Sequence, residues 1–127
     1  MEIKIYSQSD EDKLFGMLRK EGAEWEPYWG VANIEKYKKA LANSTVFVVY
    51  DEGELCGYIR CRDDDGFGVY IYDLLVDKTS RGKSFGRMLM DRVRSHFPNE
   101  TVYVMSDVDA YYEKQGYQRE GTIWKLV

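Results

Sequence analysis

An apolar stretch at residues 69–76, followed by a glycine-bearing loop and an amphipathic segment, constrains the fold of this chain more than any other feature. The amphipathic segment has apolar residues at helical spacing, namely Phe85, Met88, Leu89, Val93 and Phe97. Pro98 then ends the helix. A strand followed by a helix forms a crossover that can lead to a parallel strand, for which residues 101–105 are the candidate. The sequence therefore predicts a sheet with at least one parallel pair.

The loop of this crossover consists of Arg81, Gly82, Lys83, Ser84, Phe85 and Gly86. A loop that enters a helix presents unpaired backbone N–H groups beside the positive end of the helix dipole. Glycines let such a backbone close around an anion, so the loop predicts a seat for a phosphate group. An ordinary connection with surface charges is the alternative. A P-loop is excluded, because it needs a glycine at the position of Asp77.

The rest of the chain supplies further strands and helices. Predicted strands cover residues 2–7, 45–50, 55–62 and 117–127, the last bent at Gly121, and predicted helices follow Asp10 and cover residues 31–43. The element order is βααβββαβαβ, with the last strand optionally split. We predict a single α/β (α+β) domain over residues 1–127, with a mixed, mostly antiparallel sheet and helices on both faces.

Composition excludes several classes of protein. The net charge of −4 argues against a general nucleic-acid binder, and no stretch is apolar enough to cross a bilayer. The N-terminus starts directly as an alternating strand, with no signal-peptide pattern. Cys56 and Cys61 lie five residues apart in one predicted strand, so a regular strand would place them on opposite faces. With His96 as the only histidine, no metal site is expected, and reduced thiols favour a cytoplasmic location.

A second motif lies near the C-terminus, in the segment from Ala110 to Tyr117. It resembles the (Phe/Leu)-Tyr-Glu-Lys-x-Gly-(Phe/Tyr) segment of the GCN5-related N-acetyltransferase (GNAT) family, whose pyrophosphate loop, Gln/Arg-x-x-Gly-x-Gly/Ala, is similar to residues 81–86. The two motifs cover residues 68–118 in the family's order. Ser84 replaces the usual middle glycine, and residues 105–109 lack an Asn that relatives often carry.

The resemblance implies an enzyme that uses acetyl-coenzyme A as co-substrate and needs no metal. It assigns coenzyme binding to Arg81, Gly82, Lys83, Ser84, Phe85 and Gly86, and to the backbone of Leu75 and Val76. It also implies that the fourth and fifth strands diverge where coenzyme and acceptor meet. Tyr112 occupies the position of the general acid that protonates the departing thiolate; an amphipathic core tyrosine is the alternative.

Asp73 is the sole charged residue of the apolar stretch, and strand interiors rarely hold a lone carboxylate without a reason. An attacking amine must be neutral, whereas a free alkylamine has a pKa of about 10. Asp73 is therefore the candidate for orienting or deprotonating the amine. The alternative is a carboxylate paired with an arginine or with backbone N–H groups.

The segment at residues 21–30 combines carboxylates with aromatic rings, a composition suited to a cationic amine. Its candidate acceptor-binding residues are Glu24, Trp25, Glu26 and Tyr28. The alternative is a surface loop whose aromatic side chains pin it to the core.

The leading functional hypothesis is an acetyl-coenzyme-A-dependent N-acetyltransferase that acts on a small-molecule or peptide amine by direct attack. A non-catalytic acyl-coenzyme-A-binding sensor or interaction module is the alternative. Neither nucleic acid nor membrane is an expected partner. A homodimer is compatible with the chain, whose sequence does not determine the oligomeric state.

Overall fold

The computed structural model describes residues 1–127 and contains one five-stranded sheet in the order β1-β2-β3-β4-β5. The strands are β1 (Glu2–Ile5), β2 (Thr45–Asp51), β3 (Glu54–Asp63), β4 (Val69–Val76) and β5 (Val102–Val104). β1 to β4 pair in antiparallel fashion, and β5 pairs with β4 in parallel. The predicted mixed sheet and its parallel crossover are confirmed.

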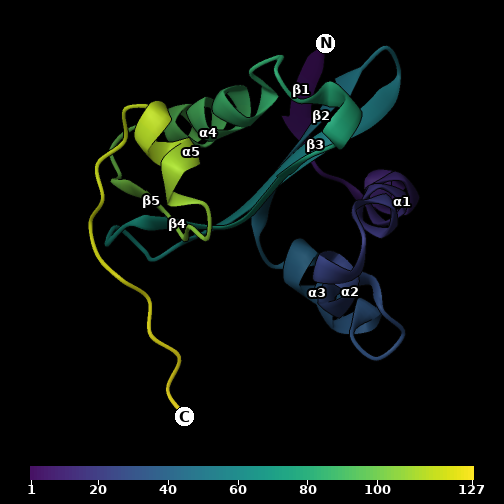
Figure 1. Ribbon diagram of the computed structural model, residues 1–127, viewed down its shortest axis with the longest axis horizontal. Helices are drawn as coiled ribbons and strands as arrows, with labels where there is room; N and C mark the ends of the chain where they lie inside the picture. Colours follow the sequence, from purple (N-terminus) through teal and green to yellow (C-terminus); the bar gives the residue numbers. More distant parts are fainter.

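Helices cover both faces of the sheet, as expected (Figure 1). On one side lie α1 (Glu11–Glu21), α2 (Glu26–Trp29) and α3 (Ile34–Ala42), and on the other lie α4 (Phe85–His96) and α5 (Asp109–Lys114). Three short 3-10 turns complete the chain: η1 (Gln8–Asp10), η2 (Ala23–Trp25) and η3 (Lys78–Ser80). No helix is of a length and apolarity that would carry it through a bilayer.

Each face of the sheet has its own apolar cluster. The first cluster joins the sheet to α1 and α3 and contains Leu14, Phe15, Met17, Leu18, Tyr37, Leu41, Val46, Val48, Leu55, Tyr58 and Leu75. The second cluster joins the sheet to α4 and contains Phe47, Val49, Cys56, Ile59, Cys61, Val69, Ile71, Phe85, Leu89, Met90 and Val93. Neighbouring strand residues such as Val48 and Val49 enter opposite clusters because side chains alternate across a strand.

A bulge in β3 overturns the prediction for the two cysteines. Val49 pairs with Gly57 and Tyr50 pairs with Leu55, so Cys56 has no partner in β2. This extra residue shifts the alternation, and Cys56 and Cys61 both enter the second cluster instead of lying on opposite faces. Both thiols are free and buried, and burial raises the pKa of Cys61 to about 11. Neither is therefore a reactive thiolate at neutral pH.

The predicted strand at residues 117–127 is wrong. The chain leaves α5 and runs away from the sheet as an extended tail (Figure 1). Its last backbone hydrogen bond joins the N–H of Tyr117 to the carbonyl of Tyr112 at 3.2 Å. A strand requires a partner for its backbone groups, and β5, the edge strand, is only three residues long.

Two smaller differences concern the N-terminal half. Residues 21–30, expected as a loop, contain η2 and α2, and Pro27 lies at the start of α2, where its missing N–H costs nothing. The helix predicted at residues 31–43 begins three residues later, at Ile34. The intervening residues turn through bonds from the N–H groups of Asn33 and Ile34 to the carbonyl of Gly30.

Candidate active site

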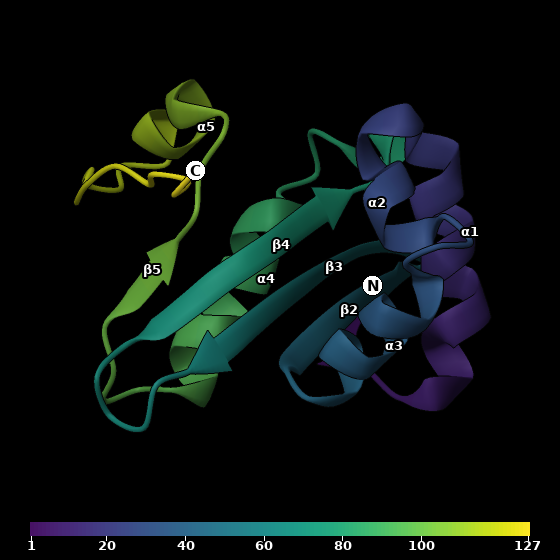
Figure 2. The same ribbon diagram turned by 90° about the horizontal axis from the view of Figure 1, so that it is seen from below.

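β4 and β5 pair over only three residues and then diverge. The last paired residues are Ile71 and Val104, and the N–H of Met105 still donates to the carbonyl of Ile71 at 3.1 Å. β4 continues to Val76, paired only with β3 on its other side. Figure 2 shows β5 turning away toward α5 while β4 runs on toward α2. The expected divergence is confirmed, and it leaves one edge of β4 open.

The backbone groups on this open edge come from Leu74 and Val76. The carbonyl of Leu75 faces β3, since its oxygen lies 3.0 Å from the position that a Cβ on Gly57 would take. The neighbouring residues point the other way, because backbone groups alternate between the two edges of a strand. In this register the backbone of Leu75 faces β3, and Leu74 lies beside Val76 on the open edge. The contact of Leu75 with the coenzyme stays a prediction.

A second bulge lies at Tyr72, between the pairs Arg60–Asp73 and Cys61–Ile71. The extra residue puts the side chains of Tyr72 and Asp73 on the same face of the sheet, where both meet Arg60. A regular strand would have sent one of them into the apolar second cluster. The bulge thus delivers a carboxylate to the face that carries α1 to α3.

Asp73 is buried and paired. Its Oδ2 accepts hydrogen bonds from Arg60 Nε at 2.5 Å and from Tyr37 Oη at 2.6 Å. Tyr37 Oη also lies 2.7 Å from Tyr58 Oη. The guanidinium of Arg60 lies between the rings of Tyr37 and Tyr72, 5.5 and 5.4 Å from their centroids. The alternative of an arginine partner is the one that the structure shows.

These contacts fix the charge states around Asp73. Burial opposes the charge of Arg60, but the hydrogen bond and the negative charge of Asp73 raise the pKa of the guanidinium. Burial, followed by the charge of Asp73, raises the pKa of Tyr37 well above its ordinary value. Both tyrosines of the cluster are neutral donors at neutral pH, and the Arg60–Asp73 pair is ionic.

The aromatic residues of the 21–30 segment reach the same cluster. The Tyr28 ring lies 4.8 Å from the Tyr37 ring, and Trp25 packs on both Tyr28 and Tyr58. Burial, together with the charge of Asp73, raises the pKa of Tyr28. Glu24 and Glu26 are exposed, and the Glu26 side chain covers Gly30. The structure brings Tyr28 close to Asp73, and Trp25 reaches the cluster through its contacts with Tyr28 and Tyr58. Both rings also pack against the first cluster.

The loop before α4 has the backbone form of an anion seat. Gly82 and Ser84 have positive φ, at 86° and 66°, and Ser84 adopts the left-handed conformation despite its side chain. The first backbone N–H of this region with a backbone acceptor is that of Met88, which donates to the carbonyl of Ser84. The N–H groups of residues 81–87 thus have no backbone acceptor at the N-terminus of a twelve-residue helix.

The side chains of this loop mostly hold it in place. Arg81 donates from Nε to the carbonyl of Val76 and from its other end to Glu21 of α1. Lys83 lies 3.4 Å from Asp51, at the end of β2. Phe85 is buried in the second cluster. The seat therefore consists of backbone amides, while Arg81 and Lys83 brace the loop against neighbouring elements and contribute positive charge.

α5 brings two adjacent tyrosines to this end of the sheet. Tyr112 is half-buried and packs against the second cluster, to which Leu74 and Val76 of β4 also pack. Burial, with the neighbouring Tyr111 and Asp107, raises the pKa of Tyr112 to about 12. The Oη of Tyr111 lies 2.5 Å from the position of a Cβ on Gly86, in the first turn of α4. Tyr112 and the anion seat thus share one end of the molecule.

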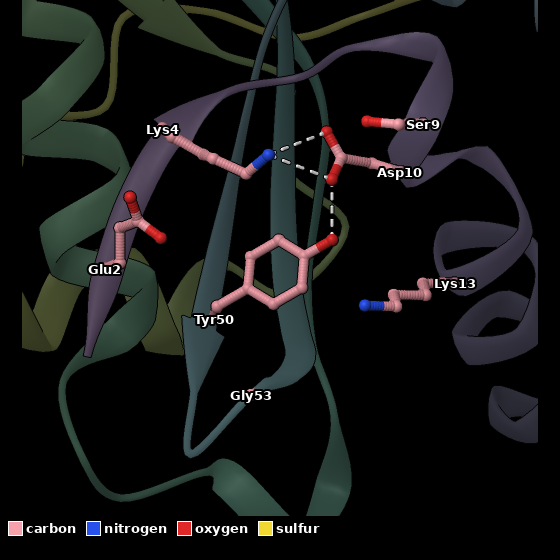
Figure 3. Close-up of a pocket in the computed structure, with 7 residues that line it drawn as sticks. All are labelled: Glu2, Lys4, Ser9, Asp10, Lys13, Tyr50 and Gly53. Atoms are coloured by element: carbon pink, nitrogen blue, oxygen red, sulfur yellow. Dashed lines mark hydrogen bonds and ion pairs between the residues drawn. The ribbon is translucent and has the colours of Figure 1, made fainter.

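A cavity of about 400 Å³ lies elsewhere, at the β1 edge of the sheet (Figure 3). Its walls come from Glu2, Lys4, Ser9, Asp10, Lys13, Tyr50 and Gly53. The buried Asp10 accepts bonds from Tyr50 Oη at 2.6 Å, the N–H of Ser7 at 2.9 Å and Lys4 Nζ. Asp10 and its donors thus form hydrogen bonds with one another and need no ligand. We therefore assign these contacts a structural role.

Sequence reasoning missed Arg60, Tyr37 and Leu74 as parts of the site. Arg60 had a usable signal, because it is a charged residue inside an apolar strand. Asp73 is a residue of opposite charge inside the next apolar strand, which a hairpin would pair with the first in antiparallel fashion. Tyr37 matched an ordinary apolar helix stripe, so nothing in its spacing marked a hydroxyl bonded to Asp73. Leu74 and Leu75 are the same residue type, and only the strand pairing distinguishes them.

Comparison with known sequences identifies the family. The sequence profile described as the acetyltransferase (GNAT) family matches residues 10–117. An uncharacterised N-acetyltransferase, ycf52, from Pyropia yezoensis is 22% identical over 102 residues, which cover 72% of this chain and 59% of that protein. The matched region thus spans about three fifths of the length of this relative. A second such protein, from Porphyra purpurea, matches to the same extent.

Solved structures share the fold at low sequence identity. A GNAT-family acetyltransferase from Streptococcus pneumoniae superposes with a TM-score of 0.74 at 21% identity, covering 98% of this chain and 97% of that one. An aminoglycoside antibiotic 6'-N-acetyltransferase from Acinetobacter haemolyticus gives a TM-score of 0.75 at 13% identity, covering 100% and 97%. With the family profile matching most of its length, this chain belongs to the acetyltransferase (GNAT) family.

Proposed function

We propose that this protein is an acetyl-coenzyme-A-dependent N-acetyltransferase that acts on a primary amine. One observation carries the proposal: the unpartnered N–H groups of residues 81–87 lie at the end of β4 where its edge is open. A diphosphate needs such a cradle of amides, and an extended pantetheine arm needs an unpaired strand edge to lie along. Family membership supports the same coenzyme.

The thioester of acetyl-coenzyme A supplies the activated acetyl group. Along the open edge, the N–H groups of Leu74 and Val76 are the donors available to the thioester carbonyl oxygen, which becomes negative when an amine attacks its carbon. The new C–N bond forms as the C–S bond breaks, and the proton lost by the amine balances the one gained by the sulfur. The products are an amide and a thiol.

Tyr112 is the proposed donor to the departing sulfur. With its pKa raised to about 12, the phenol keeps its proton at neutral pH. A thiol has a pKa of about 8.5, so full proton transfer from this phenol would be uphill. Tyr112 therefore acts chiefly as a hydrogen-bond donor that stabilises the developing thiolate. The proton that the sulfur finally gains is the one that the amine loses.

The acceptor side of the site lies on the α1–α3 face. Trp25 and Tyr28 offer aromatic rings to an ammonium group, Glu24 and Glu26 add negative charge, and Asp73 lies close to Tyr28. Because Asp73 Oδ2 is already bonded to Arg60 and Tyr37, we assign Asp73 to orienting the amine rather than to deprotonating it. The acceptor class is a small-molecule or peptide amine.

Incubation of the protein with acetyl-coenzyme A and a panel of amines, followed by mass spectrometry, tests the proposal. The panel should include polyamines, aminoglycosides, amino acids, peptide N-termini and lysine peptides. We expect a mass gain of one acetyl group on at least one amine. Coenzyme binding without any acetylated product would instead favour the non-catalytic acyl-coenzyme-A sensor.

Replacement Y112F tests the role of the phenol. We expect kcat to fall about 100-fold, while the Kd for coenzyme A stays within experimental error. The matched control is Y103F, since Tyr103 stacks on Tyr70 at the paired end of the strands, away from the open edge. Weaker coenzyme binding with kcat preserved would show that Tyr112 is not the donor.

A further inference from the structure

The hydroxyl of Tyr111 lies against the first turn of α4. A Cβ built on Gly86 would lie 2.5 Å from Tyr111 Oη, 3.6 Å from Tyr111 Cζ and 3.9 Å from Val76 Cγ2. Real Cβ atoms do not approach an oxygen to 2.5 Å, so the phenol occupies space that exists because residue 86 is glycine. Tyr111 thus lies beside both the anion seat and the end of β4.

α5 is held in this position by contacts with α4. Arg87 donates from Nη1 to the carbonyl of Gln115 at 3.0 Å and to the Gln115 side chain at 3.3 Å. The N–H groups of Gln115 and Tyr111 bond within the α5 turn. The rings of Tyr111 and Tyr112 meet edge to face, with centroids 5.1 Å apart. The location of the phenol is therefore set by packing on both sides.

The hydroxyl of Tyr111 can donate a hydrogen bond but has no acceptor within the protein. Tyr111 Oη forms no hydrogen bond within the protein, and the residue is 37% exposed. Burial and the neighbouring Tyr117 raise its pKa, so it is protonated at neutral pH. The N–H groups of residues 82–87 around it are equally without backbone acceptors. A neutral donor among free amides at a helix N-terminus adds one more contact for an anion.

We infer that Tyr111 is a coenzyme-binding residue, whose hydroxyl donates a hydrogen bond to a diphosphate oxygen seated at the start of α4. The inference rests on the proposed function, because it requires coenzyme A at that seat. It gives the two tyrosines of α5 different roles, since Tyr111 holds the coenzyme and Tyr112 serves the sulfur. The family pattern has Phe or Leu at the position of Tyr111, so this contact belongs to this chain rather than to the common motif.

Calorimetric titration with coenzyme A tests the assignment in wild type, Y111F and Y112F. We expect Y111F to weaken binding about 10-fold, the size of a lost hydrogen bond to a charged group, and Y112F to leave the Kd unchanged. Equal affinity of wild type and Y111F would overturn the inference and leave the proposed function standing. Failure of the wild type to bind coenzyme A would overturn both.

The contact with Gly86 gives an independent test. In the wild-type background, G86A pushes a methyl group against Tyr111 Oη, so both the Tm and the affinity for coenzyme A should fall. In Y111F the nearest atom becomes Cζ, at the ordinary contact distance of 3.6 Å. G86A should therefore lower the Tm and the affinity of Y111F no further. Equal losses in the two backgrounds would show that the phenol does not lie where we place it.

Discussion

Two polar regions of the molecule, the β1 edge of the sheet and the start of α4, differ in how their groups are partnered. At the β1 edge, Asp10 is buried and accepts bonds from Tyr50 and Lys4 (Figure 3) and from the N–H of Ser7, so donors and acceptor satisfy one another. At the start of α4, the N–H groups of residues 81–87 have no backbone acceptor. A cavity of about 400 Å³ lies at the first region. Unpartnered donors, more than the size of a cavity, thus mark the place where a ligand is needed.

The largest expected effect comes from putting a carboxylate into the open region. S84D keeps the left-handed conformation, which Asp tolerates, and its charge favours the N-terminus of α4 in the free protein. The same carboxylate repels a diphosphate, so we expect an affinity loss of about 1,000-fold, or about 4 kcal/mol. Calorimetric titration with coenzyme A measures it.

S84N is the matched control, because Asn has the same shape and the same tolerance of positive φ without the charge. Its affinity should remain within a few-fold of wild type. If S84D and S84N bind coenzyme A equally well, the diphosphate does not lie at this loop.

A change in the closed region should act on stability alone. D10A removes the shared acceptor and leaves the donors of Tyr50, Ser7 and Lys4 without it, which we expect to cost about 3 kcal/mol. Denaturant unfolding gives the free energy, and titration with coenzyme A should show an unchanged Kd. A D10A protein that is fully stable but binds coenzyme A weakly would reverse our assignment of the two regions.

Asp10 also predicts a dependence of stability on pH. Burial alone would raise the pKa of Asp10, but the bonds from Tyr50, Ser7 and Lys4 hold it below its ordinary value. A lowered pKa in the folded state contributes stability that is complete above the unfolded value of about 3.9 and is lost as the pH falls below it. We expect D10N to flatten the acid limb of the Tm-against-pH curve, because an amide at this position does not titrate.

The control for this effect is D63N, since Asp63 is exposed and forms no ion pair. It should leave the acid limb as in wild type. An acid limb of D10N identical to that of wild type would mean that other carboxylates determine the pH dependence.

The smallest expected effect comes from restoring the glycine at the middle of the loop. Ser84 has a φ of 66°, a conformation that costs a residue with a Cβ about 1 kcal/mol and costs glycine nothing. S84G should therefore raise the stability slightly while coenzyme affinity stays nearly constant, as measured by denaturant unfolding and titration. A loss of affinity would show instead that the serine hydroxyl itself binds the coenzyme.

Sequence patterns predicted the secondary structure correctly where the residues of one short segment determine its conformation. The apolar run that forms β4, the stripe from Phe85 to Val93 that forms α4, and the glycine loop between them follow from periodicity and turn chemistry. The positive φ of Ser84 agrees with its place in the motif, where the family usually has glycine.

What the sequence could not predict depends on pairing between distant segments. The bulges at Cys56 and Tyr72 each shift the alternation of a strand by one residue, which moves Cys56 into the second cluster and Asp73 toward Arg60. The open edge of β4 decides between Leu74 and Leu75. The tail at residues 118–127 has a strand-like sequence, yet the sheet offers it no partner.

The most direct test of the central claim is a ¹⁵N NMR titration with coenzyme A, because it reports on every backbone N–H at once. We predict that the largest shifts fall on the amides of residues 82–87, with smaller ones at Leu74 and Val76, while Lys4, Asp10 and Tyr50 stay unchanged. Shifts centred on Lys4, Asp10 and Tyr50, with residues 82–87 unaffected, would contradict the account.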